Sequence, residues 1–179
     1  MCGGHGRRRT ALCQRPSTTG AAQGSADRRS HIEPADLIRP GQAQRLAEAR
    51  EASGRESGEL AALLNISFEA YRDLEWFDEE IVDVLSFDQL LTLATAIKLE
   101  LRHFFDAGDL GQLTFAELAT RLESSATDSA SLAALEEKVG WELGKHLEDP
   151  STFGELPAIA LADIGESVGV DWRSLLPPS

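Results

Sequence analysis

The chain contains 179 residues, of which 42% are hydrophobic and 26% are charged, so it has room for one domain or two small ones. Its 17 basic and 30 acidic residues give a net charge of −13, which argues against a broad basic surface for nucleic acid. No apolar run is long enough to cross a bilayer, and the Arg-rich start lacks the apolar stretch of a signal peptide. We therefore expect a cytoplasmic protein without a membrane span.

The beginning of the chain differs in composition from the rest. Residues 1–40 contain seven arginines and three acids, a balance of +4, which leaves −17 on the remainder of the total of −13. Because few apolar side chains are present, residues 1–38 are predicted to form a disordered basic arm, which either touches an acidic surface or nucleic acid or is an unselected leader. Both cysteines, Cys2 and Cys13, lie in this arm, so neither a zinc site nor a disulfide is expected in the folded part.

From Pro40 onward, hydrophobic residues recur at helical spacing with little β-branched clustering, so the sequence predicts an all-α fold. Four helices are expected in the first half. Their limits are predicted from two stop signals and two N-terminal caps, which are Gly54, Asn65, Ser67 and Ser86. The expected helices cover residues 46–54, 59–64, 67–76 and 86–105. The acidic segment between the last two is expected to be a loop.

Four segments in this half carry a resemblance to a known family. They are LAEAREASG (46–54), ELAALLNIS (59–67), AYRDLE (70–75) and SFDQLLTLATAIKLELRHFF (86–105). In this order they resemble the Cro- and lambda-repressor-like, or XRE-like, helix-turn-helix proteins, whose last helix is Ser-capped and followed by an aromatic residue. The resemblance implies a helix-turn-helix domain over residues 39–106. Residues 107–179, in which no motif is recognised, are expected to form a helical C-terminal module.

The resemblance also implies roles for individual residues. In the family, an Arg at the end of the first helix commonly pairs with a Glu at the end of the recognition helix, and the matching residues are Arg50 and Glu75, a structural ion pair. The second helix of the family starts with a Gln that holds a DNA phosphate, where this chain has a serine. The candidate DNA-binding residues are Ser57, Ser67, Phe68, Glu69, Arg72 and Asp73.

Two functions compete for this surface. The first expectation is a DNA-binding transcription regulator that contacts double-stranded DNA as a homodimer, with Arg45, Arg55 and Arg72 supplying positive charge. The alternative is an acidic protein-interaction module, of antitoxin or immunity type, that kept the fold but lost DNA binding and neutralises a basic protein partner.

Local charges and aromatic residues bear on this choice. Glu69 and Asp73 are carboxylates at positions that face the groove, and four more acids follow in residues 76–83, where repulsion by phosphates would weaken DNA binding. Exposed Phe68, Trp76 and Phe77 would suit a protein interface, unless these rings only cover the core. The sequence therefore predicts an atypically acidic recognition surface.

In the second half, Thr114 and Ser131 are expected to cap helices, the second of which stops at Asp149. A last helix is expected over residues 157–168. Two tryptophans, Trp141 and Trp172, are expected to anchor the core.

No catalytic motif is present in the sequence. The folded part lacks a cysteine nucleophile, and its histidines, His103 and His146, belong to no HExxH, G-x-S-x-G, P-loop or G-x-G-x-x-G pattern. We therefore expect neither enzymatic activity, nor a cofactor, nor a metal site.

Overall fold

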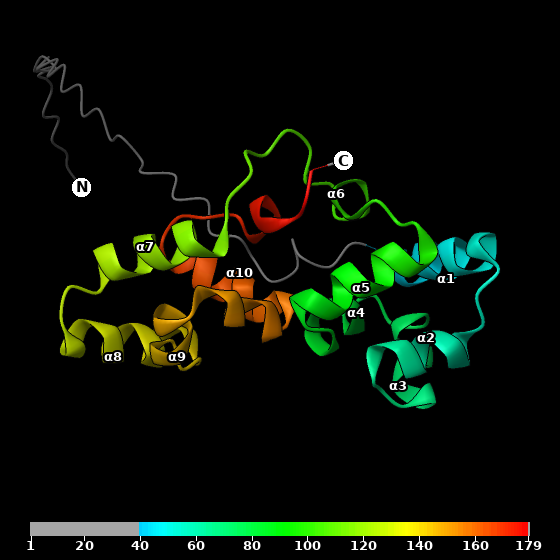
Figure 1. Ribbon diagram of the computed structural model, residues 1–179, viewed down its shortest axis with the longest axis horizontal. Coiled ribbons are helices and arrows are strands. Elements are labelled where there is room, and N and C mark those ends of the chain that lie inside the picture. Colours follow the sequence, from blue (N-terminus) through cyan, green and yellow to red (C-terminus); the bar gives the residue numbers. More distant parts are fainter. Residues whose placement is uncertain (1–39, 179) are drawn as a thin grey trace, which may run out of the picture. The chain divides into compact units, whose positions relative to one another are not determined.

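The computed structural model describes residues 40–178, and within this range every regular element is a helix. The all-α prediction is thus confirmed for the described part, whereas the arm predicted over residues 1–38, with Cys2 and Cys13, lies outside the described residues. Figure 1 shows the elements coloured by their order along the chain. The first six are α1 (Gln42–Ser53), α2 (Ser57–Leu64), α3 (Phe68–Leu74), α4 (Glu80–Val84), α5 (Phe87–Ile97) and α6 (Leu101–Phe104). The others are α7 (Phe115–Ser125), α8 (Ser129–Val139), α9 (Gly144–Glu148), η2 (Pro150–Glu155), α10 (Ala158–Ser167) and η3 (Trp172–Leu175).

Local cap chemistry sets the ends of the first three helices. Gly54 and Asn65 follow α1 and α2 in the left-handed conformation, with φ of 72° and 55°, so both predicted stop signals are confirmed. Ser67 begins α3, since its Oγ accepts a hydrogen bond of 3.0 Å from the backbone N–H of Ala70. Only three residues therefore separate α2 from α3.

The helix predicted over residues 86–105 is wrong in its length. Ser86 caps α5 as predicted, but α5 ends at Ile97 because Lys98 takes the left-handed conformation, with φ of 58°. The amide of Leu99 then bonds to the carbonyl of Ala94 at 2.8 Å, which turns the chain away from the α5 axis. A separate short helix, α6, follows.

The loop expected at residues 76–83 is also wrong in part, because α4 forms in its second half. Ile81 and Val82 of α4 are buried in the core, so tertiary burial decides the conformation of a segment whose other residues are mostly acidic. In the C-terminal half, Asp128 rather than Ser131 is the N-cap of α8, and Gly140 ends this helix well before Asp149. The predicted cap at Thr114 is confirmed by its bond with the amide of Glu117.

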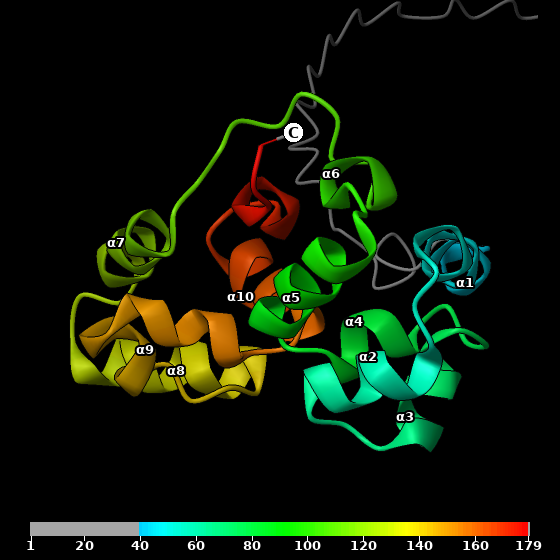
Figure 2. The same cartoon turned by 45° about the vertical axis from the view of Figure 1, so that its right-hand side comes forward.

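The hydrophobic core does not divide at residue 106. Residues 40–178 belong to one compact unit, whose buried side chains form a single cluster from α1 to η3. The amide of Phe87, at the start of α5, donates to the carbonyl of Leu156 at 2.8 Å. Figure 2 shows α10 beside α4 and α5, and α10 contacts α4. The expected boundary between residues 39–106 and 107–179 therefore falls inside this unit.

Arg102 ties α6 to the chain that follows it. This buried guanidinium donates to the carbonyl oxygens of Leu110 and Gly108 and, at 3.4 Å, to that of Leu176. The backbone N–H of Leu113 donates to the carbonyl of Ser174 at 2.8 Å. These bonds fix the linker and the C-terminal residues to each other.

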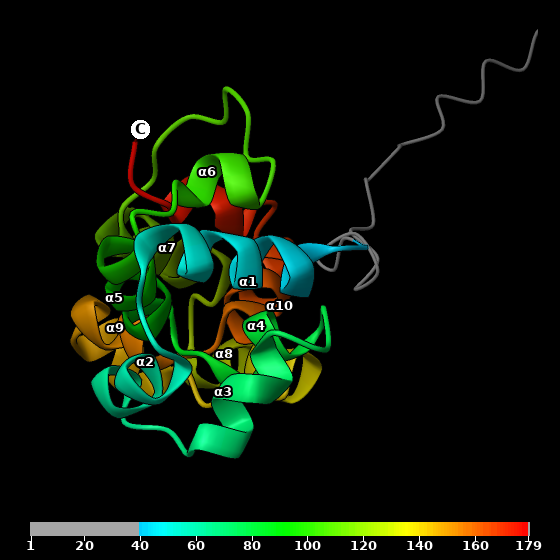
Figure 3. The same cartoon turned by 90° about the vertical axis from the view of Figure 1, so that its right-hand side faces the viewer.

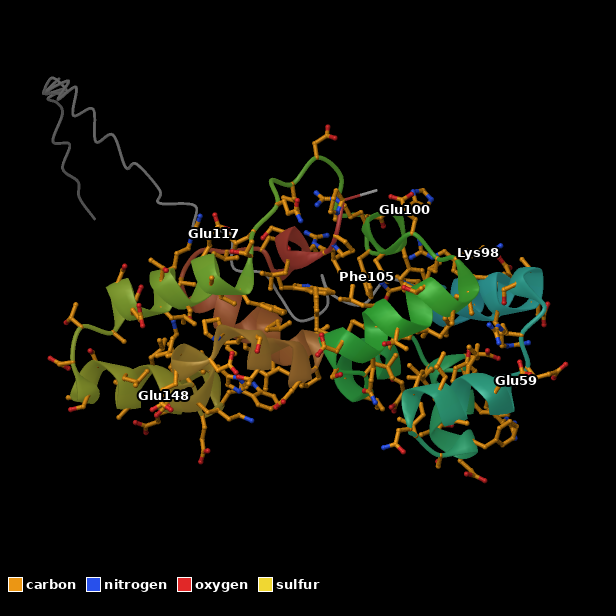
Figure 4. The ribbon with its side chains drawn as sticks, in the orientation of Figure 1. Glu59, Lys98, Glu100, Phe105, Glu117 and Glu148 are labelled. Atoms are coloured by element: carbon orange, nitrogen blue, oxygen red, sulfur yellow. The ribbon has the colours of Figure 1, made fainter. Side chains whose placement is uncertain are left out.

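Aromatic side chains fill the centre of this shared core. Trp172 is 1% exposed and meets Phe105 edge to face, with ring centroids 5.1 Å apart. Figure 4 labels Phe105. Trp141 is only half-buried. The two tryptophans thus differ in burial, and Trp172 lies deeper in the core.

A buried histidine joins α9 to η2. Nδ1 of His146 lies 2.8 Å from Oγ1 of Thr152, and the imidazole stacks on Phe153 with ring centroids 5.0 Å apart. Burial, aided by the charge of Lys145, lowers the pKa of His146 below its usual value. The folded chain therefore favours the neutral imidazole at this position.

Candidate functional site

The candidate site is built on α2, α3 and the turn between them. The side chains of Leu60, Leu64, Tyr71 and Leu74 point into the core, so the opposite sides of both helices face outward. Gln89 of α5 donates from Nε2 to the carbonyl of Leu64 at 2.7 Å, which satisfies the end of α2 and holds it on α5. Figure 3 shows α2 and α3 as adjacent helices with their outer sides uncovered by the other described helices.

An ion pair fastens the end of α3 to the end of α1. Nε and Nη2 of Arg50 lie 2.5 and 3.3 Å from the two carboxylate oxygens of Glu75, and both side chains are mostly buried. The hydrogen bond with Glu75 raises the pKa of Arg50, and burial together with the Glu75 charge raises the pKa of Tyr71. The structure thus brings together the two residues that family resemblance matched, in a bidentate geometry.

The outward side of α3 holds four of the candidate DNA-binding residues. Phe68 is 48% exposed, and Glu69, Arg72 and Asp73 are exposed as well, because positions four apart share one helix face. The hydroxyl of Ser67 is engaged as the helix cap. Ser57 is half-buried and is the first residue of α2, at the opposite end of this helix from the turn that leads to α3.

Exposed large hydrophobic side chains are confined to this part of the described chain. Residues 40–178 have five exposed large hydrophobic residues, which are Leu63, Phe68, Trp76, Phe77 and Val84. Trp76 is the most exposed of them, at 65%, and Cζ of Arg72 lies 4.5 Å from its ring centroid. This distance corresponds to a cation–π contact. The apolar surface therefore begins on α3 and continues into the turn after it.

The same segment carries an excess of acids. Residues 54–85 contain nine acidic and two basic residues. Asp78 is satisfied within the fold, since its two carboxylate oxygens accept from the backbone N–H groups of Gly41 and Ala43, each at 2.8 Å. It caps the start of α1. One of the acids expected to face DNA is thus part of the fold.

The remaining acids lie close enough to repel one another. Burial, followed by the charges of Asp73, Asp83 and Glu79, raises the pKa of Glu80. The pKa of Asp83 is raised by burial and by the charge of Glu79. The excess of acids gives the segment a negative field, which would attract a positive ligand.

Backbone hydrogen bonds hold the turn after α3 close to the end of this helix. The amide of Phe77 donates to the carbonyl of Asp73 at 2.9 Å, and the amide of Glu80 donates to that of Phe77 at 3.3 Å. We name this surface the acidic-aromatic face. It consists of Phe68, Arg72, Asp73, Trp76, Phe77 and Glu80.

Other features of the described residues offer less. No group of three or more histidines, cysteines or carboxylates in residues 40–178 could hold a metal ion, and no helix there could span a membrane. Leu63 lines a shallow cavity of about 380 Å³ together with Leu91, Thr92, Thr95 and Ala96, apart from the acidic-aromatic face. Exposed carboxylates such as Glu59, Glu117 and Glu148 surround the body on several sides (Figure 4).

Comparison with known proteins finds no match for this chain among family models, curated proteins or solved structures.

Proposed function

We propose that residues 40–105 form a helix-turn-helix domain of the Cro and lambda-repressor type, and that its acidic-aromatic face binds a basic protein partner. The tight turn with left-handed Asn65, the Ser67 cap and the Arg50–Glu75 pair support the fold. Together they hold α3 against α1 and α2 with one side free.

The confinement of exposed aromatic residues to an acidic surface carries the functional proposal. Aromatic side chains are enriched in protein interfaces, where they bury much area with little loss of conformational entropy. The surrounding carboxylates would repel DNA phosphates and attract lysine and arginine. Arg72 is the one basic residue on α3, and its guanidinium already contacts Trp76. A basic protein is therefore a better match than DNA.

DNA binding is the second candidate, and the outward placement of Arg72 favours it. An arginine on a recognition helix can donate to the O6 and N7 atoms of guanine, while Glu69 and Asp73 could accept from cytosine amino groups. The half-buried Ser57 would stand at the phosphate position. In this candidate, Arg72 must leave the Trp76 ring and reach a base edge.

Photo-crosslinking in the source cells separates the two candidates. A benzoyl-phenylalanine placed at Phe68 should form a protein adduct that survives nuclease, whereas the same probe at exposed Glu123 on α7 should not. An adduct that disappears on nuclease treatment would support DNA instead. If the probe at position 68 formed an adduct with neither protein nor DNA, the result would contradict both candidate functions.

Fluorescence anisotropy with duplex DNA over a salt series completes this test. For a DNA-binding protein, affinity falls as salt rises, and Arg72→Ala weakens it by about 1–3 kcal/mol if Arg72 contacts a guanine. We expect no measurable duplex binding even at low salt.

A further inference from the structure

Trp76 and Arg72 form a contact that indicates the chemistry of the partner. Resting on the proposed protein-binding function, we propose that Trp76 is the subsite for an arginine side chain of the partner, and that Arg72 occupies this ring in the free protein as an internal competitor.

The geometry of the ring supports this assignment. Trp76 is 65% exposed directly after α3, so its large π surface is available to solvent, and a guanidinium already lies 4.5 Å from its centroid. Arg72 lies four residues earlier, one helical turn away, and is itself exposed. The guanidinium of a partner could stack on the same face of the ring, because the exposed side chain of Arg72 can move away into solvent.

The charges close to Trp76 in the sequence favour a cation over an anion. The amide of Trp76 donates to the carbonyl of Asp73 at 3.0 Å, and the charges of Asp73, Glu79 and Asp83 all act on Glu80. A planar guanidinium can stack on tryptophan and bond to a carboxylate in the same pose, which an ammonium group does less well. Phe77, 47% exposed, offers an apolar surface for the methylene stem. The occupant is therefore an arginine-rich protein segment.

The competitor role gives Arg72 an effect of unexpected sign. Removing Arg72 frees the Trp76 ring and takes one positive charge from an acidic surface, so binding of a basic segment should strengthen. If the face bound DNA, removing the same arginine would weaken binding. The sign of one substitution thus separates the two partners.

The test uses the full chain and a fluorescein-labelled synthetic peptide in which arginines alternate with leucines, with a citrulline-for-arginine peptide as the neutral control. In fluorescence anisotropy titrations at low salt, Trp76→Ala should weaken the affinity for the arginine peptide about tenfold, and Trp76→Phe should weaken it about threefold. Arg72→Ala should strengthen it about threefold, consistent with loss of one screened repulsion. Glu137→Gln, an exposed charge change on α8, should leave affinity within twofold of wild type.

Tryptophan fluorescence gives a second readout that general charge attraction would not move. Peptide binding should change the emission of exposed Trp76, and this change should vanish in Trp76→Phe, although Trp141 and Trp172 remain. Because Trp76 is exposed, the variants should keep the wild-type circular dichroism and unfolding curve.

The inference would be overturned if Trp76→Ala left the affinity unchanged, or if the citrulline peptide bound as tightly as the arginine peptide. Weaker binding of the arginine peptide by Arg72→Ala would also overturn it. If the crosslink at position 68 still yields a protein adduct, the proposed function survives these failures. If that adduct is absent as well, both proposals fall.

Discussion

The aromatic residues of two regions of the chain have opposite environments. Between residues 63 and 84, Trp76 and Phe77 face solvent, whereas Phe105 and Trp172 further along the chain are almost fully buried against each other. Poor packing does not explain the difference, because Tyr71 in the same exposed segment is 0% exposed. The buried aromatics stabilise the fold, and the exposed ones are available to a partner.

Truncating one tryptophan in each region tests whether the buried and the exposed aromatic residues differ in their contribution to stability. Trp172→Ala should lower the free energy of unfolding by about 4 kcal/mol, because it leaves a cavity beside Phe105. Trp76→Ala should change it by less than about 0.5 kcal/mol, because most of that ring is in water already. Urea unfolding followed by far-UV circular dichroism measures both.

The milder Trp172→Phe variant keeps this prediction testable if Trp172→Ala fails to fold. Comparable losses at positions 76 and 172 would show that the exposed ring is structural and would remove the contrast.

We expect the Arg50–Glu75 ion pair to have a larger coupling free energy than the exposed ion pair of the same region. A double-mutant cycle of Arg50→Ala and Glu75→Ala should give a coupling of about 2 kcal/mol, because both groups are mostly removed from water and bond through two atoms. The matched cycle at Arg55 and Glu59, which are 3.9 Å apart and more than half exposed, should give less than about 0.5 kcal/mol. Equal coupling in the two cycles would contradict this assignment.

Alanine at two helical glycines should act in opposite directions. A methyl group at Gly165 of α10 would lie 2.5 Å from the carbonyl oxygen of Val170, so Gly165→Ala should cost about 2 kcal/mol despite the better helix propensity of alanine. Gly58 in α2 has no atom within 4 Å of that position, so Gly58→Ala should stabilise the fold by about 0.5 kcal/mol. Thermal unfolding of the two variants checks the signs, and a stabilised Gly165→Ala would mean that the chain around Val170 yields easily.

The buried His146 should make stability depend on pH in the C-terminal half. Its folded pKa lies below the ordinary 6.5, so the unfolded chain takes up a proton first as pH falls. The free energy of unfolding should therefore be highest above pH 6.5 and decrease below it, by no more than about 1.4 kcal/mol per pH unit, until the folded pKa is passed.

His146→Phe keeps a ring against Phe153 and should remove this part of the pH dependence in urea titrations at several pH values. His103→Gln, at an exposed position, serves as the control. An unchanged pH profile in His146→Phe would exclude His146 as its source.

Features set by neighbouring residues could be predicted from the sequence. Gly54, Asn65 and Ser86 mark helix ends because cap chemistry acts within one turn. The end of α5 could not be predicted, because it depends on a left-handed lysine, Lys98, and residues other than glycine and asparagine rarely mark a helix end in this way. The helix α4 could not be predicted either, because it depends on the burial of Ile81 and Val82 in the core.

The candidate site shows the same limit. The outward residues of α3 follow from helical spacing once the turn is located, and resemblance matched Arg50 with Glu75. The role of Asp78 could not be foreseen, because its carboxylate accepts from the backbone N–H of Gly41, the N-cap of α1, which lies 37 residues earlier in the chain. Sequence alone also could not decide whether Trp76 was buried, since a tryptophan after an amphipathic helix is compatible with either environment.

The bond from Phe87 to Leu156 can form only after the C-terminal half of the chain has been synthesised. On the ribosome, α1, α2 and α3 emerge long before the carbonyl of Leu156, so the side of α5 that packs against η2 stays open until the C-terminal helices have been made. A chain stopped near residue 106 would expose this apolar side. The nascent protein therefore passes through a stage in which its core, and not only its acidic-aromatic face, can attract other proteins.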